Sequence, residues 1–134
     1  MKSLSLDFHF HSPIQKVWFA LTDSATLSKW MFFKENDFQP VVGHKFTLRM
    51  EPAAGWNGVV EGEVLIVEEP YRLSYTWTSL GEENTVTWTL REDENGGTHV
   101  HLEQTGISSE QAFHGATYGW QGMEQQLERV LSEV

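Results

Sequence analysis

Residues 71–90, YRLSYTWTSLGEENTVTWTL, decide the fold because they alternate twice between apolar and polar side chains. Such a period of two is typical of a strand that is buried on one face. The apolar face of the first run consists of Tyr71, Leu73, Tyr75 and Trp77. Val86, Trp88 and Leu90 repeat the pattern against threonines. The short connection between the two runs predicts that they pair antiparallel.

Further strands are predicted on both sides of this pair. On the N-terminal side, residues 46–50 alternate in the same way, and 59–67 form a longer strand that stops before a Glu-Pro pair. The two faces of 59–67 stay ambiguous, because its glutamates share a parity with some of its apolar residues. On the C-terminal side, Asn-Gly-Gly at 95–97 is a strong hairpin signal that leads into Val100 and Leu102.

The N-terminal part predicts one strand followed by two short helices. Residues 3–10 alternate as a strand whose apolar face carries leucines and phenylalanines. The sequence SPIQ at 12–15 matches a capping box and predicts a helix over 13–21. Asp23 can cap a second short helix that reaches Trp30.

The C-terminal part predicts one long helix, because apolar residues recur there at spacings of three and four. These residues are Ala116, Trp120, Met123, Leu127, Val130 or Leu131, and Val134. Ser108 or Ser109 could cap the helix. Gly115, Gly119 and Gly122 each weaken its first half by about 1 kcal/mol relative to alanine. They suggest a close backbone approach, a bend or late ordering of this half.

These elements predict one α+β domain that spans residues 1–134. A curved antiparallel sheet of about six strands would lay its concave apolar face across the long C-terminal helix. The length is enough for one hydrophobic core and too small for two. With 40% hydrophobic residues, the chain can build that core without disulfides or a structural metal.

Composition excludes several classes of function. The chain has no cysteine, so it can form neither a disulfide nor a thiolate zinc site, and it has no cysteine nucleophile. Its net charge of −10 repels phosphate backbones, which argues against nucleic acid as a partner. Neither a signal peptide nor an apolar run long enough to span a membrane is present, so we expect a cytoplasmic protein. Nucleophile motifs and phosphate-binding glycine loops are missing, so no cofactor is implied.

Six segments taken in order resemble the Aha1-type (activator of Hsp90 ATPase homologue) domain of the START-like, or SRPBCC, superfamily. They are SPIQKVWFALTDSATLSKWM (12–31), VVGHKFTLRM (41–50), VVEGEVLIVEEPYRLSYTWT (59–78), NTVTWTLRE (84–92), GGTHVHLEQTG (96–106) and GWQGMEQQLERVL (119–131). The resemblance implies a helix-grip fold with a cavity between the sheet and the C-terminal helix. Members of this superfamily include lipid and polyketide binders, cyclases and activators of a chaperone, so fold alone does not determine activity.

Aromatic residues and methionines are abundant on the faces predicted to point inward, and they are the candidate ligand-binding residues. The candidates are Trp30, Met31, Phe32, Phe46, Tyr75, Trp77, Trp88, Phe113, Tyr118, Trp120 and Met123. Aromatic ring faces offer a large contact area, and methionine adapts its shape, so such a lining suits a flat apolar ligand. The alternative is that these residues fill a solid core.

We therefore predict noncatalytic binding of a small hydrophobic molecule, aromatic or lipid-like. A first alternative is a protein-interaction module that resembles a chaperone ATPase activator. A second is a cyclase or hydrolase, which ranks lower because almost no ionisable residue has inward parity. His9, His11, His99 and His101 could cluster on the outer face and bind a divalent metal, but solvated strand residues explain them as well, and we predict no metal site.

Overall fold

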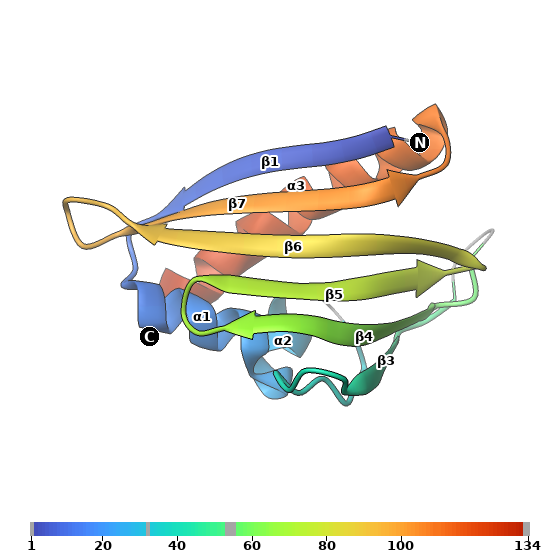
Figure 1. Ribbon diagram of the computed structural model, residues 1–134, viewed down its shortest axis with the longest axis horizontal. Helices are drawn as coiled ribbons and strands as arrows, with labels where there is room; N and C mark the ends of the chain where they lie inside the picture. Colours follow the sequence, from blue (N-terminus) through green and yellow to red (C-terminus); the bar gives the residue numbers. More distant parts are fainter. Residues whose placement is uncertain (1, 32, 53–55, 133–134) are drawn as a thin grey trace.

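The computed structural model describes residues 2–31, 33–52 and 56–132. Within them the chain forms one open antiparallel sheet, two short helices after the first strand and a long C-terminal helix, as predicted (Figure 1). The elements are β1 (Lys2–Phe10), α1 (Ile14–Thr22), α2 (Ser24–Met31), β2 (Glu35–Asn36), β3 (Lys45–Arg49), β4 (Val59–Glu68), β5 (Arg72–Ser79), β6 (Glu82–Glu92), β7 (Thr98–Ile107) and α3 (Glu110–Ser132).

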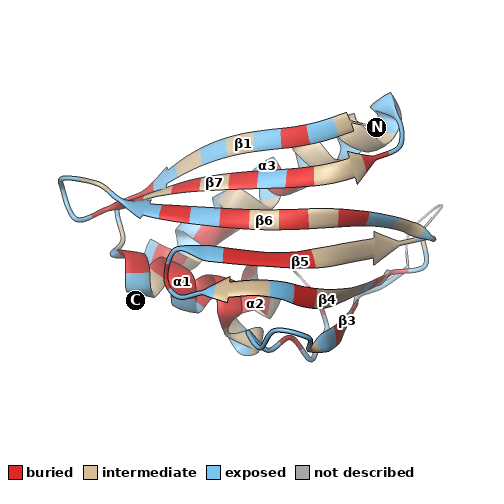
Figure 2. Ribbon diagram, viewed as in Figure 1, coloured by how far each residue is buried: buried red, intermediate tan, exposed pale blue. Residues whose placement is uncertain are grey.

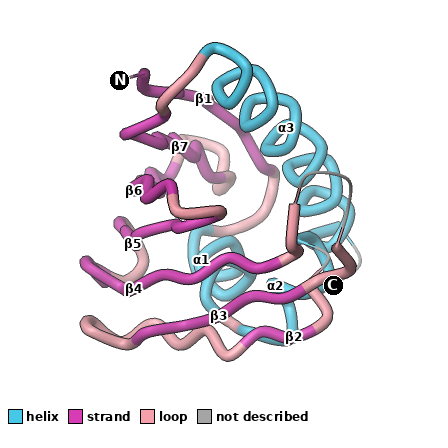
Figure 3. Tube along the Cα trace, turned by 90° about the vertical axis from the view of Figure 1, so that its right-hand side faces the viewer, coloured by secondary structure: helices cyan, strands magenta, loops and turns pink. Residues whose placement is uncertain are grey.

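The strands of the described residues lie in the order β1-β7-β6-β5-β4-β3-β2, and every neighbouring pair is antiparallel. The chain therefore runs as a meander from β2 to β7, and β1 joins the far edge beside β7. The sheet is curved, and the three helices lie on its concave side (Figure 3). Among the strands of the described residues, β2 alone is not predicted from the sequence, because two residues are too few to show an alternation.

Two of the three helix caps predicted from the sequence are confirmed, and one is wrong. Asp23 caps α2, since its Oδ2 accepts hydrogen bonds from the backbone N–H and the hydroxyl of Thr26. Ser109 caps α3 by accepting from the N–H of Ala112 at 3.1 Å. The capping box predicted at the start of α1 is wrong. Pro13 is the N-cap, no side chain caps the helix, and the Ser12 carbonyl accepts from the Thr98 hydroxyl instead.

The core lies between the concave face of the sheet and the helices (Figure 2). The predicted inward residues Leu73, Val86 and Trp88 are each at most 2% exposed. Tyr71 was predicted to share the apolar inward face, and this prediction is wrong. It precedes β5 in the turn after β4 and is 53% exposed. No helix in the described part of the chain is both long and apolar enough to cross a membrane.

Candidate functional site

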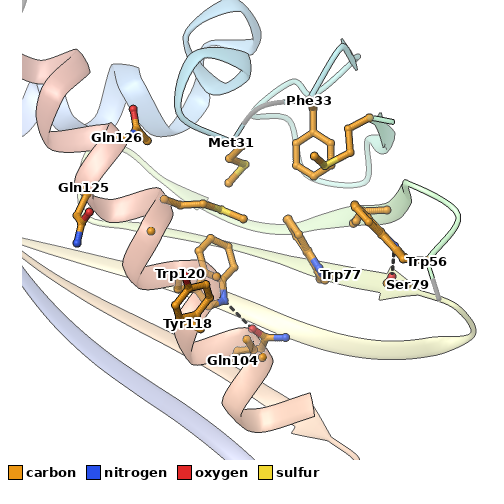
Figure 4. A pocket seen from close by; sticks show the side chains of 17 residues that line it. Met31, Phe33, Trp56, Trp77, Ser79, Gln104, Tyr118, Trp120, Gln125 and Gln126 are labelled. Atoms are coloured by element: carbon orange, nitrogen blue, oxygen red, sulfur yellow. Dashed lines mark hydrogen bonds between the residues drawn. The ribbon is translucent and has the colours of Figure 1, made fainter. Parts of the chain in front are cut away.

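A pocket of about 560 Å³ opens between the middle of α3 and the sheet (Figure 4). Its apolar lining consists of Met31, Phe33, Met50, Trp56, Val60, Trp77, Ala116, Trp120 and Met123. Its remaining lining residues are Ser79, Gln104, Gly115, Tyr118, Gly119, Gly122, Gln125 and Gln126. The pocket thus draws on α2, on three strands, on the segments between α2 and β2 and between β3 and β4, and on α3, elements far apart in the sequence.

Aromatic rings form the floor of the pocket. Trp77, on β5, lies with its ring centroid 5.5 Å from that of Trp120, on α3, and 6.3 Å from that of Phe33. Trp120 is 5% exposed and also packs edge-on against the core residue Trp88. Trp77 is only partly buried, so it presents ring surface to the pocket. Such surface favours apolar or aromatic ligands.

Glycines on α3 keep the pocket open. Gly115, Gly119 and Gly122 follow one another at helical spacings of four and three, and all three line the pocket. A Cβ atom built on any of them would meet no atom within 4 Å. Close packing therefore does not explain these glycines. The sequence suggested a close backbone approach, a bend or late ordering as the reason for these glycines. The first of these predictions is wrong.

A chain of buried hydrogen bonds crosses the inner end of the site. The indole N–H of Trp120 donates to Oε1 of Gln104 at 2.7 Å. Nε2 of Gln104 donates to Oδ1 of Asn84 at 2.8 Å, and Nδ2 of Asn84 donates to the carbonyl of Gly106 at 2.8 Å. This network joins α3 to β7 and β6 and holds the Trp120 ring in place. A second indole, that of Trp56, donates to the Ser79 hydroxyl at 2.9 Å.

Ionisable groups are scarce at this site. Among the described lining residues only Tyr118 can ionise, and it is 83% exposed. Burial raises the pKa of Tyr75, but this tyrosine lies outside the pocket, with its hydroxyl accepting from the Trp88 indole at 2.8 Å. The described lining therefore contains no pair of groups for general acid–base catalysis.

The structure divides the predicted ligand-binding residues into two groups. Met31, Trp77, Tyr118, Trp120 and Met123 line the pocket. Trp30, Phe46, Tyr75 and Trp88 lie in the closed core, each at most 3% exposed, and Phe113 packs against that core. Phe32 lies outside the described residues.

The lining also contains residues that were not among the predicted ligand-binding residues, including Phe33, Trp56, Ser79 and Gln104. For Gln104 a signal was present, because it follows Val100 and Leu102 at the same parity of β7 and thus puts an amide on an apolar face. For Trp56 the sequence predicts only a glycine-flanked loop.

Histidines do gather on the outer face, as the pairing of β1 with β7 requires. His99 Nε2 and His101 Nδ1 each lie 3.0 Å from Oδ1 of Asp7, and His9 contacts Asp93. The hydrogen bond from His101, followed by that from His99, lowers the pKa of the Asp7 carboxyl. The described residues contain no group of three or more histidines and carboxylates arranged to hold a metal ion.

Known proteins and a protein family match almost the whole chain. The family model for "Activator of Hsp90 ATPase homolog 1-like protein" matches residues 11–132. A solved structure of a protein from Mesorhizobium loti is 33% identical, with a TM-score of 0.87, over 99% of this chain and 98% of that one. No match was found among curated proteins.

Two further solved structures share the fold at lower identity. An HSP90 activator from Plasmodium falciparum is 20% identical, with a TM-score of 0.81, over 98% of this chain and 97% of that one. A protein of the dynemicin biosynthetic locus is 21% identical, with a TM-score of 0.84, over 98% of this chain and 48% of that one. By its match over residues 11–132 and its likeness to the Mesorhizobium protein, the chain belongs to the activator of Hsp90 ATPase homolog 1-like family.

Proposed function

We propose that this protein binds a small hydrophobic molecule, aromatic or lipid-like, in the pocket between α3 and the sheet. The observation that carries the proposal is the pocket itself. Its volume of about 560 Å³ lies in the range of small-molecule sites, roughly 300 to 1,000 Å³. Its walls are mainly aromatic rings, methionines and glycine backbone, with a few amide and hydroxyl groups.

The same lining supports binding without catalysis. A cyclase or hydrolase needs an ionisable side chain within hydrogen-bond reach of the reacting atoms. The described lining offers only the exposed hydroxyl of Tyr118 for this purpose. Amides and indole N–H groups can orient a ligand, but they do not ionise near neutral pH and so cannot act as a general acid or base.

The test uses the six tryptophans as reporters in amide and indole NMR spectra. The indoles of Trp56, Trp77 and Trp120 line the pocket, whereas those of Trp18 and Trp30 lie in the core away from it. Titration with a panel of fatty acids, sterols, flavonoids and polyketide-like aromatics should give saturable shifts at the first three. If no compound shifts them, or if all indoles shift alike, the proposal is refuted.

A second candidate is that the protein acts on a chaperone. The family description and the HSP90 activator from Plasmodium falciparum favour it, and the net charge of −10 suits a basic partner surface. Its test is the ATPase rate of an Hsp90 titrated with this protein. A rate that stays unchanged up to saturating concentrations would exclude this function.

A further inference from the structure

Gln104 places a buried amide in the otherwise apolar floor of the pocket. It is 5% exposed and occupies an inward position of β7, where Val100 and Leu102 precede it at the same parity. A polar side chain so deeply buried needs hydrogen-bond partners on all its groups. How those partners are arranged indicates which part of the amide is left for a ligand.

The orientation of this amide is determined from both ends of its network. An indole N–H can only donate, so the atom of Gln104 that faces Trp120 must be the oxygen. A backbone carbonyl can only accept, so Asn84 must turn its nitrogen to Gly106 and its oxygen to Gln104. Both ends therefore demand the same arrangement, with Gln104 Nε2 donating to Asn84 Oδ1 at 2.8 Å.

These hydrogen bonds leave one N–H of the Gln104 amide without a partner among the described residues. Nε2 carries two hydrogens, and within the described residues its one partner is Asn84. Figure 4 shows the nitrogen on the side of the amide turned away from Trp120. Gln104 is a lining residue of the pocket, so we take this N–H as the group that a ligand would meet.

We propose that the ligand carries a hydrogen-bond acceptor oxygen, of the ketone or ester type, which accepts from Nε2 of Gln104. Gln104 is then the specificity-determining residue of the site, and the ligand class is an apolar ring system with a carbonyl rather than a pure hydrocarbon. This inference rests on the proposed function, because it assumes that the pocket is occupied.

Ser79 offers a second donor to the pocket, but a less constrained one. Its hydroxyl accepts from the Trp56 indole at 2.9 Å and keeps its own O–H, whose direction no hydrogen bond within the described residues fixes. Gln121 lies on α3, is exposed and does not line the pocket. Gln121 therefore provides a matched control for Gln104, since the same substitution can be made at both positions.

The experiment compares two probes of nearly equal shape, 2-acetylnaphthalene and 2-isopropenylnaphthalene, which differ in having a carbonyl oxygen or a methylene carbon. Dissociation constants come from titration of tryptophan fluorescence. One net hydrogen bond should make the ketone bind about 3- to 10-fold more tightly to the native protein. Gln104→Met should bring the two affinities together, whereas Gln121→Met should keep the native preference.

Infrared spectroscopy supplies a readout that does not depend on any variant. The carbonyl stretch of bound 2-acetylnaphthalene should move to lower frequency than in hexane, as hydrogen bonding requires. Equal affinities together with an unshifted carbonyl stretch would overturn the inference while leaving the pocket function intact. Failure of both probes to bind would refute the occupied pocket on which the inference depends.

Discussion

Replacing Gly119 by alanine should stabilise the protein, although glycine substitutions inside a compact fold usually do not. Gly119 lies in the middle of α3, outside the left-handed region of backbone conformation. A Cβ atom there would meet nothing within 4 Å, so no packing strain opposes the change. The intrinsic difference between glycine and alanine in a helix interior then applies, about 0.8–1 kcal/mol. For a chain of this length that gain raises Tm by about 2–5 °C.

The assay is urea unfolding followed by circular dichroism, with thermal melting as a second measure. Gly62→Ala is the matched control, because a Cβ on Gly62 would lie within 3 Å of the Thr76 carbonyl oxygen and of the Phe46 ring. Such overpacking should destabilise by about 1–3 kcal/mol. Loss of stability in Gly119→Ala would refute the reasoning, since the glycine would then have a structural role that the open space does not show.

Three further predictions concern the pocket, the core and the outer face. Gly119→Leu should fold but fill the pocket, so the ligand-induced shifts of the pocket indoles should disappear from its NMR titration. Tyr75→Phe leaves the buried Trp88 indole N–H without its acceptor and should cost about 1–3 kcal/mol in urea unfolding. Because the pKa of Asp7 is lowered in the folded state, the unfolded chain takes up its proton first on acidification. The Asp7 contribution is therefore complete above about pH 4 and is lost as pH falls through the folded value. Asp7→Asn should consequently flatten the decline of the urea midpoint below pH 4, and an unchanged decline would contradict this.

The strands were predictable because one face of each is buried. Alternation located β5 to within about one residue and found the middle of β6, which extends to Glu82 and Glu92 beyond the alternating run. The Asn-Gly-Gly turn located the hairpin between β6 and β7. The faces of β4 were not predictable. Val60 and Val64 point inward with Gly62 between them, and the register then shifts between Val64 and Ile66. An irregularity of this kind breaks the period of two on which the sequence analysis depends.

The pocket was only partly predictable, because parity tells which face a side chain is on and not how deep it lies. Trp77 and Trp88 both point to the concave side, yet only Trp77 borders the pocket. The difference comes from the helices, since Trp30 on α2 and Trp120 on α3 both pack edge-on against Trp88. Packing between elements far apart in the sequence leaves no local pattern to detect.

The pocket exists because α3 is held at some distance from the central strands. α3 packs against α2 and β1, while Gly115, Gly119 and Gly122 border the pocket at positions where larger side chains would enter it. Glycine lowers the stability of α3 at the positions that border the pocket. The empty space around each glycine shows that close packing does not require a glycine there. A helix that is less stable where it borders a pocket is expected of a binding site, because selection acts on ligand binding as well as on the stability of the fold. A more stable Gly119→Ala variant together with a folded Gly119→Leu variant that no longer binds would separate these two requirements experimentally.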